Sequence, residues 1–127
     1  MTPVEFEVLA GEFMSKHFGT PLNKRKMPGH PKLFDFVSAD GQIVGDAKYY
    51  SLVRGRSIPP AKWSGVAEHV WFLEKVAARQ KFLVFGNDRQ VPVMWLNRWG
   101  LFVTDEISFF FLSDEGGFEE LRKQSLG

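Results

Sequence analysis

The spacing of apolar residues along the chain predicts two amphipathic helices. In the segment 3–18 they recur at the three- and four-residue steps that place side chains on one helical face. Thr2 can cap this helix, Pro3 suits its first turn, and Gly19 can end it. A second helical pattern covers about residues 61–79. The apolar faces consist of Phe6, Leu9, Ala10, Phe13 and Met14, and of Trp63, Val66, Val70, Leu73 and Ala77.

Five further apolar runs predict the strands of a sheet. The proline- and glycine-containing stretch 20–31 predicts a loop, and the tail 118–126 predicts a short helix. The resulting order is helix, strand, strand, helix, strand, strand, strand. It predicts one α/β domain over residues 1–127, with a mixed sheet flanked by helices. The strand ranges are 33–39, 42–51, 81–85, 92–97 and 107–112.

The Asp-Gly pair at 40–41 is a strong hairpin signal between the first two strands. A two-residue loop there, or a four-residue loop with the same centre, places Asp35 directly opposite Asp46. Opposed Cβ atoms are about 4.5–5.5 Å apart, a distance at which like charges destabilise a strand pair. A divalent cation between the two carboxylates would remove this repulsion. The alternatives are a shared proton or a nearby basic side chain.

Lys48 follows Asp46 by two residues, so both side chains leave the same face of the strand. Two interpretations apply to this spacing. Lys48 can neutralise Asp46 as a structural ion pair. Alternatively, its ammonium group can orient an attacking water or stabilise charge on a phosphate beside a bound metal. The spacing alone favours the ion pair, whereas the opposed Asp35 favours the functional interpretation.

These residues resemble the core motif of the PD-(D/E)XK nuclease superfamily, which includes many restriction endonucleases and Holliday-junction resolvases. That motif is an Asp, a variable spacer, then Asp or Glu, any residue, and Lys. Here it corresponds to Asp35 and to Asp46-Ala47-Lys48. The superfamily also has a helix before the motif and an αβ unit after it. The resemblance therefore spans most of the chain and implies a restriction endonuclease-like fold, although Phe34 stands where a Pro often precedes the first Asp.

The resemblance implies a metal-dependent nuclease that hydrolyses DNA phosphodiester bonds. Asp35, Asp46 and the Ala47 carbonyl would hold Mg²⁺, with Mn²⁺ as a substitute, and Lys48 would position the attacking water. Many members carry a Glu on the first helix, and Glu7 is the best match because it borders the apolar face. Solvated surface charge accounts for Glu7 equally well. The competing function is a catalytically inactive module of the same fold that binds nucleic acid or a protein partner.

The formal net charge of +1 is unevenly distributed. Basic residues gather before and after the motif, in two segments without acidic residues. Such residues can contact backbone phosphates without reading sequence, and a solvated loop is the alternative on charge alone. DNA is the favoured partner, with RNA as an alternative. The residues concerned are Lys24, Arg25, Lys26, Arg54, Arg56 and Lys62.

Other features narrow the class of protein. With no Cys there is no disulfide or thiolate site, which fits a cytoplasmic protein, and no apolar run reaches the length of a membrane span. The three histidines are too scattered for a zinc motif, and we expect His69 to be solvated on the polar side of its helix. The run 107–112 predicts a buried strand, with a dimer edge as the alternative, because nucleases of this superfamily and size often act as dimers.

Overall fold

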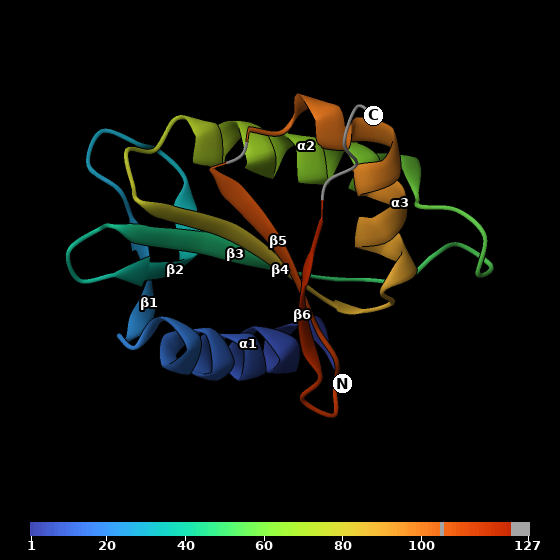
Figure 1. The fold of residues 1–127 in the computed structure, drawn as a ribbon, viewed down its shortest axis with the longest axis horizontal. Coiled ribbons are helices and arrows are strands. Elements are labelled where there is room, and N and C mark those ends of the chain that lie inside the picture. Colours follow the sequence, from blue (N-terminus) through green and yellow to red (C-terminus); the bar gives the residue numbers. More distant parts are fainter. Residues whose placement is uncertain (105, 123–127) are drawn as a thin grey trace.

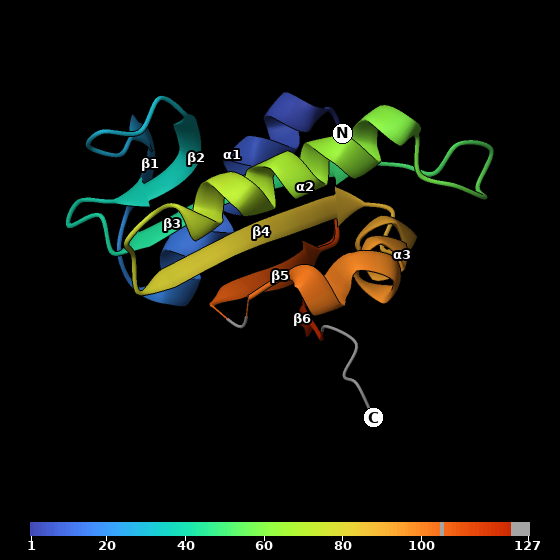
Figure 2. The ribbon, with the colours of Figure 1, turned by 90° about the horizontal axis from the view of Figure 1, so that it is seen from above.

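The structure is a computed structural model that describes residues 1–104 and 106–122. A six-stranded mixed sheet forms its centre. Helix α1 covers one face of the sheet, and helices α2 and α3 cover the other (Figure 1, Figure 2). The strands are β1 (Leu22–Lys26), β2 (Leu33–Ser38), β3 (Ile43–Tyr50), β4 (Gln80–Asn87), β5 (Ile107–Leu112) and β6 (Phe118–Leu121). The helices are α1 (Pro3–Phe18), α2 (Pro60–Glu74) and α3 (Gln90–Trp99), followed by a 3-10 turn, η1 (Gly100–Phe102).

The strands lie side by side in sequence order. Strand β2 is antiparallel to both of its neighbours, β1 and β3. Strands β3, β4 and β5 are parallel to one another, and β6 returns antiparallel to β5. Parallel neighbours need a crossover connection, which α2 supplies between β3 and β4 and α3 with η1 supplies between β4 and β5. The predicted α/β class with a mixed sheet is confirmed.

Helix α1 forms as its sequence predicts. Thr2 and Glu5 make a capping box, in which the Glu5 N–H donates to the Thr2 hydroxyl at 3.2 Å and the Thr2 N–H donates to the Glu5 carboxylate at 2.9 Å. Gly19 ends the helix with a φ of 70°, a left-handed conformation that costs glycine little. The buried face consists of Phe6, Ala10 and Met14.

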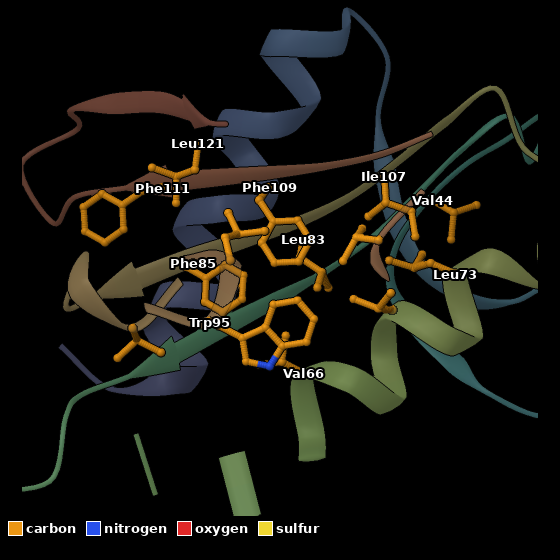
Figure 3. Packing of buried hydrophobic residues seen from close by; sticks show 14 of the residues in the cluster. Val44, Val66, Leu73, Leu83, Phe85, Trp95, Ile107, Phe109, Phe111 and Leu121 are labelled. Carbon is orange, nitrogen blue, oxygen red and sulfur yellow. The ribbon is translucent and has the colours of Figure 1, made fainter. Parts of the chain in front are cut away.

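Two apolar clusters hold the layers together. The smaller one joins α1 to the sheet, and the larger one joins α2 and α3 to the opposite face. Figure 3 shows the larger cluster, in which the Trp95 ring of α3 lies 5.6 Å from the Phe109 ring of β5. Val66, Val70 and Leu73 of α2 are buried in it, as their spacing predicts. These contacts fix α2 over β3 and β4, where the candidate site lies.

The predicted hairpin is confirmed, and its register is the predicted one. A four-residue loop, residues 39–42, joins β2 to β3, and Val37 pairs with Val44. Gly41 adopts a φ of 71° and its N–H donates to the Ser38 carbonyl at 2.9 Å. This register brings Asp35 and Asp46 to corresponding positions on the two strands.

The prediction of a loop over 20–31 is wrong for its first half, which forms strand β1. Only Leu22 of this strand is buried, so it carries almost no apolar signal. Strand β1 is held by backbone pairing with β2, which requires no apolar side chains.

The prediction of a strand over 92–97 is also wrong, because these residues lie in helix α3. Val91 and Trp95, four residues apart, are both buried, which is helical spacing rather than alternation. Pro92 lies in the first turn, where no intrahelical N–H bond is lost.

The end of the chain and the end of α2 differ as well. Residues 118–121 form strand β6 rather than the start of a helix, and residues 123–126 of that prediction lie outside the described residues. Because β6 pairs with β5, the predicted buried strand at 107–112 is confirmed and its alternative as an exposed dimer edge is wrong. Helix α2 ends at Glu74, earlier than the predicted Arg79. Within residues 1–104 and 106–122, no helix combines the length and apolar character that would let it cross a membrane.

Candidate functional site

A β-bulge in β2 changes the direction of Asp35. Asn23 pairs with Val37 and Arg25 pairs with Phe34, so the two residues Asp35 and Phe36 together face the single residue Lys24 of β1. The packing agrees, because Phe34 lies in the cluster under α2 and Phe36 lies in the cluster under α1, although residues two apart share a face in a regular strand.

Beyond the bulge, side chains replace the ladder between β2 and β3. The last ladder pair is Phe36 with Gly45. At the next position the Asp35 N–H donates to Asp46 Oδ1 at 2.9 Å, and the Ala47 N–H donates to Asp35 Oδ2 at 3.0 Å. Each carboxylate therefore satisfies a backbone donor of the opposite strand, and the two carboxylates are held next to each other.

Asp46 and Lys48 project from β3 toward α2, as their spacing predicts. The alternate residues Ala47 and Tyr49 pack against the cluster under α1. Only 1% of Asp46 and 7% of Lys48 is exposed. Two charged side chains are thus buried between the sheet and a helix, a position that is costly without compensating partners.

His69 of α2 is the main partner that the sequence did not indicate. Its Nε2 lies 3.2 Å from Lys48 Nζ, and its Nδ1 lies 3.8 Å from Asp46 Oδ2. The expectation that His69 is solvated is wrong, because 21% of its side chain is exposed and its Nδ1 is buried. His69 follows Val66 by three residues and precedes Leu73 by four, and because both are buried, the helix turns His69 toward β3 rather than toward solvent.

Two lysines lie against the carboxylates. Lys32, from the loop before β2, places its Nζ 3.3 Å from Asp46 Oδ2. Lys24 of β1 places its Nζ 2.8 Å from Glu7 Oε1 and 4.0 Å from Asp35 Oδ1. The structure therefore brings Glu7 to the Asp35 side of the site through Lys24, and it brings Asp35, Asp46, Ala47 and Lys48 together directly.

Burial and charge shift the protonation equilibria of this site. Burial raises the pKa of the Asp35 carboxyl, and the negative charge of Asp46 raises it further, against the hydrogen bond from Ala47. Burial lowers the pKa of Lys48 to about 8, because the attraction of Asp46 only partly offsets the loss of solvation. The Lys48 amine therefore loses its proton far more easily than an exposed lysine.

The basic residues that were predicted to contact phosphates divide into two sets. Lys24 belongs to the site, and Arg25 donates to the carbonyls of Ser38 and Ala39 at 3.0 and 3.2 Å, which braces the hairpin loop. The remaining four are exposed, and Lys62 lies over the Tyr50 ring at 4.6 Å. The exposed residues are Lys26 of β1, Arg54 and Arg56 of the loop 51–59, and Lys62 of α2.

The site opens on two sides. A groove of about 880 Å³ runs along α1 and β1 and is lined by Glu7, Lys24 and Asp35. A second hollow of about 380 Å³ is lined by Ala47, Lys48 and Lys62. Polar groups of the site are therefore reachable from the α1 side at Asp35 and from the α2 side at Lys48.

The donors at this site fit a divalent cation. Asp46 Oδ2 is a buried carboxylate oxygen with no hydrogen-bond donor. A second carboxylate, Asp35, is adjacent to it, and hard oxygen ligands of this kind suit Mg²⁺ or Mn²⁺. Among the described residues no three side chains of His, Cys, Asp or Glu converge as a complete ligand set. Instead, the ammonium groups of Lys24 and Lys32 supply the positive charge at the carboxylates.

Comparison with known protein families, with curated proteins and with solved structures finds no match to this chain.

Proposed function

We propose that the protein is a metal-dependent nuclease that hydrolyses DNA phosphodiester bonds at Asp35, Asp46 and Lys48. The observation that carries the proposal is the pair of adjacent carboxylates, one of which has a buried oxygen without a hydrogen-bond donor. The Lys32 ammonium at 3.3 Å pairs with this oxygen, and a divalent cation that replaced it could coordinate both carboxylates. The restriction endonuclease-like fold is part of the same proposal.

Within the proposal each residue has a distinct task. Asp35, Asp46 and the Ala47 carbonyl hold Mg²⁺ or Mn²⁺, and Glu7 assists from α1. The bound metal lowers the pKa of water and neutralises charge on the scissile phosphate. Lys48, which faces the hollow beside α2, contacts the phosphate or orients the attacking water.

The exposed cations suit a polyanionic substrate. Lys62 lines the same hollow as Lys48, and Arg54 and Arg56 lie on the adjoining loop between β3 and α2. Contacts from these residues to backbone phosphates would place a strand across the site without selecting a sequence. DNA is the proposed substrate, and RNA in place of DNA is an outcome that the same assay detects.

The decisive experiment is cleavage of plasmid, linear, branched and single-stranded DNA with Mg²⁺ or Mn²⁺. The test variant is Asp46→Asn, whose side-chain oxygen can still accept the Asp35 N–H. Because Asp46 is a proposed metal ligand, we expect the variant to lose at least about a hundredfold in cleavage rate, the upper end of the loss on removing a group that only orients a ligand. Asp40→Asn, the same change in the hairpin loop, is the matched control and should cut like the wild type.

An inactive binding module is the second candidate, and the lysines favour it, since Lys24 and Lys32 already neutralise both carboxylates. This candidate predicts that the wild type and Asp46→Asn bind DNA equally with and without metal, and that neither of them cleaves it. Metal-dependent cleavage that Asp46→Asn retains at the wild-type rate would contradict the assignment of the site.

A further inference from the structure

Two buried side-chain atoms face each other across the gap between β3 and α2. Within residues 1–104 and 106–122, Asp46 Oδ2 and His69 Nδ1 are the only buried side-chain nitrogen or oxygen atoms without a hydrogen-bond partner. They lie 3.8 Å apart. Asp46 Oδ2 is nonetheless paired in charge with the Lys32 ammonium, whose Nζ lies 3.3 Å away. The two exceptions in the described chain are thus one pair, which points to a ligand that both atoms share.

The position of the imidazole is fixed from the opposite side. His69 Nε2 lies 3.2 Å from Lys48 Nζ. A metal binds only an unprotonated ring nitrogen, so a metal at Nδ1 requires the tautomer with its proton on Nε2. In that tautomer Nε2 donates to the neutral Lys48 amine, and metal binding releases the ammonium proton to solvent. The ring also lies beside Phe72 one turn further along α2, with centroids 6.5 Å apart. These contacts leave Nδ1 as the nitrogen that faces the carboxylate.

We propose that His69 Nδ1 is a metal ligand beside Asp46, so that the site binds Mn²⁺ in preference to Mg²⁺. The inference rests on the proposed nuclease function and adds a residue and a metal preference to it. Imidazole nitrogen is a good ligand for transition metals, whereas Mg²⁺ favours oxygen ligands and retains several waters. A site with an imidazole nitrogen among its ligands therefore favours the transition metal.

Lys32 is the group that a cation at this position must displace. Its ammonium lies 3.3 Å from Asp46 Oδ2, and 14% of its side chain is exposed. The residue belongs to the loop that precedes β2, so its side chain can swing outward without disturbing the sheet. Exchange of one cation for another keeps the buried carboxylate neutralised throughout.

Metal binding, measured apart from catalysis, tests the inference. Pulsed electron paramagnetic resonance on the Mn²⁺-loaded wild-type protein should show ¹⁴N modulation from a coordinated imidazole, and His69→Gln should abolish it. Titration with MnCl₂ and MgCl₂ should show that His69→Gln lowers Mn²⁺ affinity about tenfold or more. Mg²⁺ affinity should change by less than about threefold. His17→Gln, on α1, is the matched control and should leave the signal and both affinities unchanged.

The outcomes separate this inference from the function on which it rests. Mn²⁺ binding that Asp46→Asn abolishes, but that lacks ¹⁴N modulation in the wild type, would overturn the role of His69 and leave the nuclease proposal standing. His69 would then donate its Nδ1 proton toward Asp46 and orient the carboxylate. Absence of binding by either metal to the wild type would overturn both proposals. The wild-type spectrum decides the matter even if His69→Gln fails to fold.

Discussion

At the turn end of the β2–β3 hairpin, Val37 pairs with Val44 and Phe36 with Gly45, and every one of these residues is buried. One position further from the turn, the ladder is replaced by bonds from backbone N–H groups to the carboxylates of Asp35 and Asp46. The first region is held by backbone pairing and apolar contacts. The second is held by charged side chains that take over the backbone's hydrogen bonds.

One hairpin thus combines a close-packed apolar end with a charged end. Close packing at the turn end anchors the register, so the open end can hold two carboxylates that repel each other. Beside the bulge opposite Lys24, the Asp46 carboxylate accepts the Asp35 N–H in place of a backbone carbonyl of β3. We therefore expect substitutions at the open end to act on charge and activity, and substitutions at the turn end to act on packing and stability.

The largest effect is expected for Lys48→Met at the open end. The loss of the amine should lower the cleavage rate about 100- to 1,000-fold, the magnitude for losing one donor that stabilises transition-state charge. Free energy of unfolding at pH 7 should nevertheless rise by roughly 3 kcal/mol, because burial of the charged lysine costs about 1.4 kcal/mol for each unit by which its pKa falls. Urea unfolding and initial cleavage rates measure the two effects.

The pH dependence of stability checks the sign of this effect. The pKa of Lys48 falls from 10.5 in the unfolded chain to about 8 in the fold. Between these values the unfolded state binds the additional proton, so the contribution of Lys48 to stability rises with pH over that window. Lys48→Met should lack this rise. A variant that is less stable than the wild type at pH 7 would show that the amine stabilises the fold.

An intermediate effect is expected for Gly45→Ala at the turn end. A Cβ at this position would lie 2.5 Å from the ring of Phe82, which is fully buried. Overpacking of this kind costs about 1–3 kcal/mol. We expect Gly45→Ala to lose that amount of unfolding free energy at every pH between 6 and 9. Gly65→Ala in α2 is the control, since its nearest neighbour is 3.9 Å away and alanine favours a helix. Equal stability of both variants would contradict the packing argument.

The smallest effect is expected for Lys32→Gln, which removes the ammonium from Asp46. A metal must break the Lys32–Asp46 ion pair before it binds, so Mn²⁺ affinity should rise at least about twofold, the effect of a weak ion pair, once the competing charge is gone. The free-ion electron paramagnetic resonance signal measures this affinity. Lys26→Gln makes the same charge change on β1, and a similar rise in that variant would mean that net charge, rather than competition at the site, is responsible.

Local sequence predicted the parts of the site that are held by local structure. The Asp-Gly turn and the alternation of the following strand predicted the register of Asp35 with Asp46 and the shared face of Asp46 and Lys48. Helix α1 carries its own start and stop signals in Thr2 and Gly19. The bulge at Asp35 could not be predicted, because it depends on β1, whose polar sequence predicted a loop.

The sequence by itself determined helix α1, the hairpin and the shared face of Asp46 and Lys48, because each depends on residues that lie close together in the chain. The order of helical and strand patterns indicated the α/β class. Only the tertiary structure decided that residues 22–26 pair with β2, that residues 90–99 form a helix on the same face of the sheet as α2, and that His69 turns toward Asp46. Those outcomes depend on which surface each segment must cover. Burial against an element distant in sequence, rather than local helix or strand propensity, therefore determined which side chains contact the charged residues of the site.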